Sequence, residues 1–310
     1  MARYLEIGTE IAHRVRSGEL SAGTELPAIR ETARTHTTTS STVVRAYRYL
    51  ADGGVITLAD RRRAKVATDG KIAAARLLEA DRVFRLAGSD DPALQIMIDH
   101  AAPAVVPVGN RGSFQGLRAL ARGTADGAAI HLRHHSGTYN APFAHALLRH
   151  RQPHLIHLWR REQGLLVAPG NPRGATTIAA LARLRVAKRE VGTGTRALLD
   201  QLLIATGIDP DDVKGPAFRS HLEIALAVAT GIADVGLGVR AAANDFNLCF
   251  IPLAWEPYDI VLSGDALGAA RPLITTLRNP KVQASITKLG GYDLELAGEV
   301  EPLSDKSATL

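Results

Sequence analysis

The sequence is poor in cysteine, in aromatic residues and in long apolar runs, and these shortages exclude whole classes of protein. One cysteine, Cys249, among 310 residues rules out an internal disulfide and fits a reducing compartment. No apolar run is long enough to cross a membrane, and the first residues lack the apolar segment of a secretory signal. We therefore expect a soluble, cytoplasmic protein with no membrane contact. The run Leu248–Leu253 predicts that Cys249 is a buried strand residue.

Signatures of catalysis and of cofactor binding are also missing. The chain has no Gly-x-Ser-x-Gly elbow, no P-loop ending in Gly-Lys-Ser/Thr and no Gly-x-Gly-x-x-Gly turn. His131, His134 and His135 lie close together, but they lack a cysteine partner and the His-Glu-x-x-His spacing of zinc sites. Solvated loop histidines are the favoured interpretation. We expect no catalytic residue, no metal and no cofactor.

Length and charge point to two domains with different partners. A chain of 310 residues exceeds one ordinary domain, and 46% hydrophobic with 5% aromatic residues is typical of Ala/Val/Leu-rich α/β proteins. Residues 1–70 hold eleven Lys/Arg and eight Asp/Glu, a net charge of +3 out of +6 for the whole chain. Positive charge is therefore densest at the front, as suits a nucleic-acid partner.

The first seventy residues predict three short helices and a basic hairpin. Apolar residues from Leu5 to Val15 recur at helical spacing and stop at Gly18. A second helix is expected from about Ala28 to Thr35, and a Thr/Ser-rich turn, 36–41, leads into a third over 42–52. Residues 55–59 and 64–68 read as a hairpin with the tip Asp60-Arg61-Arg62-Arg63, and Lys65 adds to its charge.

This order is that of a winged helix-turn-helix, in which the third helix reads DNA. Hydroxyls at the start of that helix can approach phosphate or base edges, and Arg45 and Arg48 further along can grip phosphate or guanine. The alternative is a solvated helical cap with ordinary surface arginines.

Residues 4–68 resemble the DNA-binding domain of GntR-type bacterial regulators. The matching pieces are Ser17-Gly18-Glu19-Leu20, the segment 23–31 with Leu26-Pro27-Ala28-Ile29-Arg30, and the segment 42–50. The resemblance implies DNA contacts from the arginine of the Leu-Pro segment and from the start of the third helix: Arg30, Ser40, Ser41, Thr42 and Arg45. The tip departs from the glycine-based wing of the family, and its three arginines strengthen the expected phosphate contacts.

Strands and helices alternate from residue 81 onward, the pattern of an α/β domain. Strands are expected over 83–87, 105–108, 128–132, 154–159, 164–168, 184–187, 233–238 and 250–253. Residues 71–80 predict a connecting helix. The stretch Val191-Gly192-Thr193-Gly194-Thr195-Arg196 follows a strand and opens a helix, so it is a candidate anion cradle capped by Thr195.

Three strand–loop–helix junctions carry a hydroxyl where a helix begins: Ser89, Ser113 and Thr195. Ligands of open α/β sheets bind beyond the carboxyl ends of strands, so the three loops could converge on one anion. Alternatively, each hydroxyl only caps its helix. Asp90 and Asp91 would repel an anion unless they cap the following helix or face away.

Residues 81 to about 300 resemble the periplasmic-binding-protein-like domain of bacterial regulators and molybdate-related proteins. The matches include 86–94, 112–126, 129–132, 137–140, 163–172, 192–196 and 231–238. The resemblance implies two α/β lobes around a ligand cleft, lobe one at 81–160 with 256–310 and lobe two at 161–255. The domains are then 1–70, a linker at 71–80, and 81–310.

The resemblance also places the ligand site in the loops that face the cleft. In related molybdate-binding proteins, serines of one lobe and backbone N–H groups of the other surround an oxyanion. The expected ligand-binding residues are Ser89, Arg111, Gly112, Ser113, His131, Tyr139, Thr193, Gly194, Thr195 and Arg196. Arg111 and Arg196 favour a carboxylate or phosphate over molybdate or tungstate, because guanidinium binds such groups in bidentate geometry.

The whole sequence thus predicts a ligand-responsive transcription regulator. It is expected to bind a pseudo-palindromic duplex operator as a homodimer and to sense a small anion or polar metabolite, with molybdate or tungstate as one option. The alternative is a small-molecule-binding protein or enzyme that uses the cleft, with the front domain as a protein-contact module.

Overall fold

The structure is a computed structural model that describes residues 2–59, 62–78, 83–109 and 112–303. The chain forms two compact units, Met1–Arg82 with Gly264–Arg271, and Val83–Ser263 with Pro272–Leu310. None of the helices in these described ranges is long and apolar enough to cross a bilayer.

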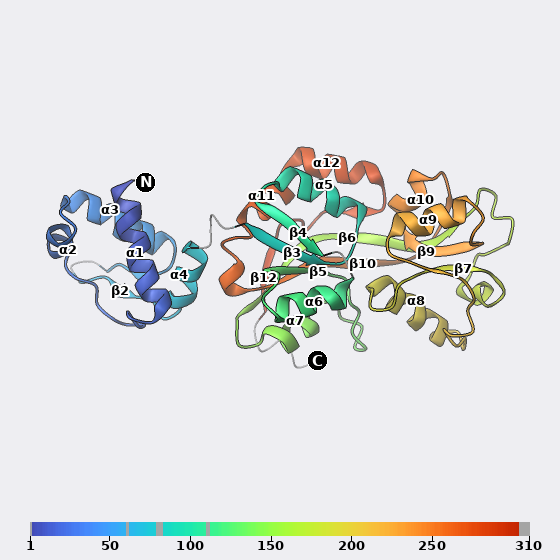
Figure 1. Ribbon diagram of the computed structural model, residues 1–310, viewed down its shortest axis with the longest axis horizontal. Coiled ribbons are helices and arrows are strands. Elements are labelled where there is room, and N and C mark those ends of the chain that lie inside the picture. The colour runs from blue at the N-terminus through green and yellow to red at the C-terminus, as the bar shows by residue number, and fades with distance from the viewer. Residues whose placement is uncertain (1, 60–61, 79–82, 110–111, 304–310) are drawn as a thin grey trace. The chain divides into compact units, whose positions relative to one another are not determined.

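The first unit is a helical domain with a small antiparallel sheet. Its elements are α1 (Arg3–Ser17), α2 (Ile29–Thr35), α3 (Ser40–Asp52), β1 (Ile56–Thr57), β2 (Lys65–Val66) and α4 (Gly70–Leu78) (Figure 1). The helix α1 ends where the sequence predicted, because Gly18 takes the left-handed conformation (φ 88°) that favours glycine. Apolar faces of α1, α3, α4 and both strands share one core. Gly264–Arg271 belongs to this unit, and Arg76 Nε donates to Gly264 O at 2.6 Å.

The second unit is built on one sheet with the order β4-β3-β5-β10-β6-β9-β7-β8, and β11 and β12 pair with β6. Its strands are β3 (Phe84–Gly88), β4 (Val105–Gly109), β5 (Gly127–Ile130), β6 (Pro153–Val167), β7 (Val186–Arg189), β8 (Ala217–Phe218), β9 (Val235–Val239), β10 (Cys249–Ser263), β11 (Tyr292–Asp293) and β12 (Val300–Pro302). The two long strands β6 and β10 pair antiparallel from end to end and run through both halves of the sheet (Figure 1).

Helices cover both faces of each half of this sheet. We call β3, β4, β5 and their helices the first lobe, and β7, β8, β9 and their helices the second lobe. The helices are α5 (Pro92–Ala101), α6 (Ser113–Ala121), α7 (Ala141–Leu148), α11 (Arg271–Leu277) and α12 (Pro280–Leu289) in the first lobe, and α8 (Gly194–Ala205), α9 (His221–Ala229) and α10 (Arg240–Asp245) in the second. In Figure 1, α5 and α12 lie on one face of the first lobe and α6 and α7 on the other, while α9 and α10 lie opposite α8 in the second.

The long strands are where the structure departs from the sequence prediction. Residues 154–159 and 164–168 were expected as separate strands, yet they form the single strand β6. The strand expected over 250–253 extends to Ser263. The polar run Arg160–Gln163 broke the apolar pattern of β6, and Trp255-Glu256-Pro257 broke that of β10. Most of these polar side chains are buried in contact with one another, so the strands continue through them.

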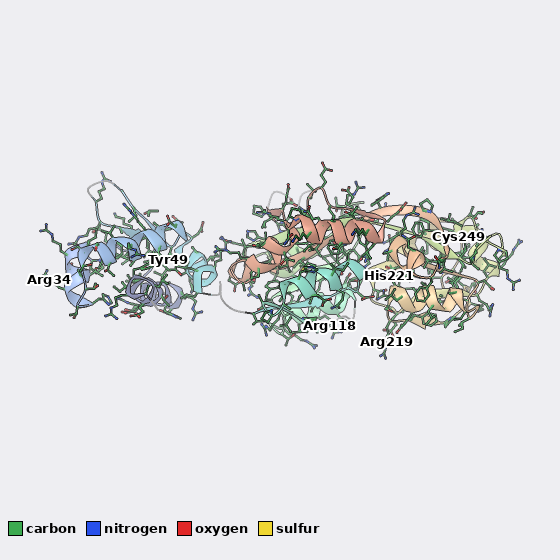
Figure 2. All side chains as sticks on the ribbon, turned by 90° about the horizontal axis from the view of Figure 1, so that it is seen from above. Arg34, Tyr49, Arg118, Arg219, His221 and Cys249 are labelled. Atoms are coloured by element: carbon green, nitrogen blue, oxygen red, sulfur yellow. The ribbon has the colours of Figure 1, made fainter. Side chains whose placement is uncertain are left out.

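Two smaller predictions also differ from the structure. Cys249 does lie in a strand, but it is exposed because it is the first residue of β10, at the sheet end (Figure 2). The strand expected over 184–187 runs from Val186 to Arg189 instead.

Candidate functional site

The predicted recognition helix α3 begins with a cluster of hydroxyl groups. Its N-cap is Thr39, whose Oγ1 accepts from the Thr42 N–H at 3.3 Å. Ser40 and Ser41 were expected in the preceding turn but form the first turn of the helix, and both are exposed. Small exposed hydroxyls thus stand at the helix start, as contact with phosphate or base edges requires.

The arginines expected at DNA surround this helix. Arg30, Arg45 and Arg48 are exposed, and the guanidinium of Arg45 lies 4.2 Å from the ring centre of Tyr4. That cation–π contact holds the side chain in place while leaving its N–H groups available. A groove of about 610 Å³ lies between α2 and the start of α3, with Arg30, Arg34 and Ser40 among its lining residues. Figure 2 shows Arg34 pointing outward from this unit.

The wing is described only in part. Its strands pair through Ile56 with Val66 and Thr57 with Lys65, so the predicted hairpin is present. Arg62 and Arg63 are exposed, and Lys65 Nζ lies 3.3 Å from Glu25 Oε1. Asp60 and Arg61 lie outside the described residues.

In the second unit, none of the three predicted hydroxyls caps its helix. Asp91 caps α5 by accepting from the Ala93 N–H at 2.8 Å, and Gly112 precedes α6, whose first residue is Ser113. The cap of α8 is Thr193, which accepts from the Arg196 N–H at 3.3 Å, so the prediction for Thr195 was wrong. Thr193 takes this role because its backbone is still extended, whereas Thr195 already lies within the first turn.

The three hydroxyl loops do lie together, around the imidazole of His131 at the end of β5. Ser89 Oγ lies 2.8 Å from His131 Nε2, and Ser113 Oγ accepts from the His131 N–H at 3.3 Å. Gly194 faces the same ring so closely that a Cβ there would lie 2.7 Å from His131 O. Thr195 Oγ1 accepts from Gln163 Nε2 at 3.1 Å. Each hydroxyl is therefore satisfied within the protein.

The two lobes touch at this point. The Phe114 N–H at the start of α6 donates to Gly192 O at 3.4 Å, and Gly112 packs on Thr193 closely enough that a Cβ would lie 2.9 Å from Thr193 Cγ2. Loops from opposite halves of the sheet thus meet at this point.

Beneath His131, two side chains donate to one carboxylate oxygen, and the imidazole lies beside it. Glu256 Oε1 accepts from Arg161 Nε at 2.9 Å and from Gln163 Nε2 at 2.7 Å, and lies 3.0 Å from His131 Nδ1. The other end of the Arg161 guanidinium donates to Asp91 Oδ2 at 2.6 Å. All five side chains are buried, so the ion pairs are shielded from water and the whole network depends on being complete.

Burial sets the protonation states of this network. It lowers the pKa of His131 to about 4, with Arg161 acting in the same direction, so the imidazole is neutral near pH 7. Burial alone would raise the pKa of Glu256, but His131 and Arg161 outweigh it and hold that pKa at about 2. A neutral His131 can therefore donate from Nδ1 to Glu256 and accept at Nε2 from Ser89.

The structure also shows how Asp90 and Asp91 are accommodated. Asp91 caps α5, pairs with Arg161 and accepts from Tyr292 OH at 3.0 Å. Asp90 reaches the second lobe instead: its Oδ2 lies 3.7 Å from Arg189 Nη1 and accepts from the His221 N–H at 3.4 Å. Both carboxylates are thus bound by groups of the protein.

A cavity of about 100 Å³ adjoins the network. His131, Tyr139 and Gly194 are among its lining residues, together with Phe114, Leu132, Arg133, Phe143, Ala197, Leu198, Gln201 and Glu256. Arg196 is not among them, because its Nε donates to Asp200 Oδ1 at 2.8 Å along its own helix. Arg111 lies outside the described residues.

Several residues of the site were missed at the level of sequence: Arg161, Gln163, Glu256, Arg189 and His221. A charged residue inside a strand is the signal that could have found Arg161 and Glu256, because a buried charge needs a partner. Arg189 ends β7 and His221 begins α9, the same strand-end and helix-start positions that were recognised at Ser113 and Thr195.

Comparison with known proteins defines the class of this chain. Residues 97–278 match the family described as the PBP superfamily domain, and residues 3–66 match the family of bacterial regulatory proteins, gntR family. The chain belongs to the PBP superfamily domain family and carries a gntR-family winged helix-turn-helix at its front.

Similar proteins include one curated relative and several solved structures. The chain is 34% identical over 195 residues to the uncharacterized protein YvgK of Bacillus subtilis (strain 168), covering 61% of this chain and 63% of that protein. It thus spans less than two thirds of the length of this relative.

Two solved structures share the fold of the second unit. One is a putative phosphate ABC transporter substrate-binding protein with bound phosphate from Clostridium perfringens, at 13% identity and a TM-score of 0.53 over 68% of this chain and 99% of that one. The other is PhnD1 from Prochlorococcus marinus (MIT 9301) in complex with methylphosphonate, at 14% identity and a TM-score of 0.50 over 74% and 95%.

Proposed function

We propose that this protein is a one-component transcription regulator, which binds duplex DNA through the gntR-family domain and senses a small anion or polar metabolite in the cleft of the second unit. The observation that carries the proposal is the meeting of the two lobes at His131, because loops from both lobes enclose one point beside a cavity. A DNA-binding domain on the same chain gives such binding a regulatory output.

Several features support an anionic effector. The helices α6 and α8 both begin at the cleft, and helix N-termini attract negative charge through their free N–H groups and dipole. The structural relatives hold phosphate and methylphosphonate in the same fold. His131 already occupies the space between Ser89 and Ser113, which favours an organic anion that binds beside the imidazole over molybdate or tungstate seated between the serines.

The effector class can be tested by thermal unfolding of the full chain against a panel of molybdate, tungstate, sulfate, phosphate, methylphosphonate and small carboxylates. A ligand present at a hundred times its dissociation constant adds about 2.7 kcal/mol. For a unit of this size that raises the midpoint by roughly 5–10 °C. A shift with molybdate or tungstate alone would contradict the preference for an organic anion, and no shift with any anion would contradict an anion sensor.

The DNA-binding role predicts a duplex affinity that falls steeply with salt. Each phosphate neutralised by lysine or arginine contributes close to one unit to the slope of log affinity against log salt. The protein is expected to act as a homodimer on a pseudo-palindrome, with half-sites about one helical turn apart or a multiple of it. Selection of duplexes from a random library, followed by anisotropy at several salt concentrations, tests both points. Binding that is insensitive to salt would favour a protein-contact module instead.

A second function has one specific observation in its favour. Ser89, His131 and Glu256 are arranged in the order of a nucleophile, a base and an orienting acid, with distances of 2.8 and 3.0 Å. Ser89 is only 2% exposed, which argues against attack on a substrate. Hydrolysis of p-nitrophenyl acetate that disappears in Ser89→Ala would establish an esterase, and equal rates in both proteins would exclude it.

A further inference from the structure

Two side chains of the second lobe are buried without the partners that burial normally requires. Arg189 is 2% exposed, and its Nε has no hydrogen-bond partner among the described residues. His221 is 1% exposed, and within the same ranges neither ring nitrogen has one. Such unpaired buried atoms are rare in folded proteins because each costs free energy, so their presence calls for a missing partner.

Both residues stand at the N-terminus of α9. His221 is the first residue of this nine-residue helix, and Ser220 caps it by accepting from the Glu223 N–H at 3.0 Å. Arg189 ends β7, on the same lobe. Figure 2 places His221 where the two lobes approach each other. A guanidinium group and a helix N-terminus that face one point form a typical environment for an anionic oxygen.

The group now at that point is the carboxylate of Asp90 from the opposite lobe. One oxygen, Oδ2, accepts from the His221 N–H at 3.4 Å and lies 3.7 Å from Arg189 Nη1. Both distances are long for charge-assisted hydrogen bonds, which are usually about 2.7–2.9 Å. The carboxylate therefore neutralises the subsite from a distance and leaves Arg189 Nε unpaired.

We propose that Arg189, His221 and the N-terminus of α9 form the anion-recognition subsite of the cleft, and that Asp90 is a built-in competitor that an anionic ligand must displace. The ligand is a small molecule that carries a carboxylate, phosphate or phosphonate group, since all three offer paired oxygens to a guanidinium. This inference deepens the proposed function and rests on it.

The electrostatics around Arg189 and His221 agree with this assignment. Burial lowers the pKa of Arg189 and the nearby Asp90 charge raises it, so the guanidinium has less counter-charge than its burial calls for. Burial, with Arg189 and Arg161, lowers the pKa of His221 well below its ordinary value. The neutral imidazole can therefore give one N–H donor to a ligand without adding charge.

The experiment compares anion binding by calorimetry on the full chain, with malonate, phosphate and methylphosphonate as probes. Asp90→Asn removes the competing charge and retains a side chain of similar size. Its affinity for the responding probe should rise at least about tenfold, because a like charge within about 4 Å of the ligand is lost. Asp99→Asn makes the same charge change at an exposed position of α5 and should leave affinity unchanged. The probe that responds identifies carboxylate or phosphorus oxyanion.

A second pair of variants tests the subsite itself. Arg189→Met should abolish binding, while Arg219→Met removes an 82% exposed charge beside α9 and should have little effect. If Arg189→Met fails to fold by circular dichroism, Arg189→Lys keeps the charge and should still lose at least about tenfold, since the Nε donor is gone.

The outcomes separate the two proposals. Equal or weaker binding by Asp90→Asn, with normal binding by the wild type, would overturn the competitor and leave the anion sensor standing. Equal losses in Arg189→Met and Arg219→Met, or unchanged binding in Arg189→Lys, would overturn the subsite. No binding of any probe by any of the proteins would overturn both proposals.

Discussion

Arg161 is the residue on which the buried network depends most, and replacing it gives a quantitative test. Its guanidinium joins Glu256 Oε1 at 2.9 Å to Asp91 Oδ2 at 2.6 Å, and none of its side-chain surface is exposed. Arg161→Met keeps much of the volume but leaves two buried carboxylates without their counter-ion. Removing one partner of a buried pair costs about 3–5 kcal/mol.

The neighbouring arginine on the same strand supplies the matched control. Arg160 is 55% exposed and lies 3.8 Å from Asp293 Oδ2. Exposed pairs of this kind contribute roughly 0–1 kcal/mol. In a unit of this size each kcal/mol moves the melting midpoint by about 2–4 °C. Arg161→Met should therefore lower the midpoint by about 6–20 °C, and Arg160→Met by no more than about 4 °C.

The assay is urea unfolding and calorimetric melting of both variants and of a triple variant in which the two carboxylates left without a counter-ion are also neutralised. Adding Asp91→Asn and Glu256→Gln to Arg161→Met should restore most of the loss, because the penalty arises from uncompensated charge rather than from lost packing. The reasoning would be refuted if Arg161→Met cost no more than Arg160→Met, or if the triple variant were less stable than Arg161→Met alone.

Three further predictions concern the lobe contact, pH and DNA. In Gly194→Ala, the new Cβ would lie 2.7 Å from His131 O and hold the lobes apart, so the affinity for the anion should fall about 5–150-fold. Gly109→Ala is the control, because a Cβ there has open space around it and should leave the affinity unchanged. The contribution of His131 to the free energy of unfolding is fully present above pH 6.5 and is lost as the pH falls toward 4, because the unfolded chain binds a proton that the buried imidazole does not. Urea unfolding at several pH values measures this dependence. Between these pH values, the free energy of unfolding should rise with pH by about 1.4 kcal/mol per unit less in His131→Asn than in the wild type. Arg45→Ala should weaken duplex binding and reduce its salt slope by about one unit in anisotropy, and an unchanged slope would remove this side chain from the interface.

Much of the fold follows from local sequence signals. The first unit is predictable because its helices are amphipathic and end at recognisable residues such as Gly18, whose left-handed backbone needs no side chain. The order of strands and helices in the second unit follows from apolar runs separated by turns. The loops at Ser89, Ser113 and Thr195 could be placed at the cleft because each follows a strand and precedes or opens a helix.

The charged half of the site could not be predicted in the same way. Arg161 and Glu256 lie in strands whose apolar pattern they interrupt, so local patterning suggests a loop at both places. Their burial is possible only because β6 and β10 are adjacent, which brings together residues 95 positions apart in the chain. Pairing across that distance is a property of the sheet register, and no window of sequence contains it.

The same pairing limits how a ligand can bind here. Ser89, Ser113 and Thr195 are all satisfied by groups of the protein, so a ligand that only offered acceptors to them would have to break existing hydrogen bonds and gain little. Arg189 and His221 are among the buried side chains whose nitrogen atoms lack a hydrogen-bond partner within the described ranges, and the carboxylate that faces these two belongs to the other lobe. At the proposed subsite, an anionic ligand would replace the Asp90 carboxylate and release a contact between the lobes. An exchange of this kind ties occupancy of the cleft to the position of the lobes, which is what a sensor requires.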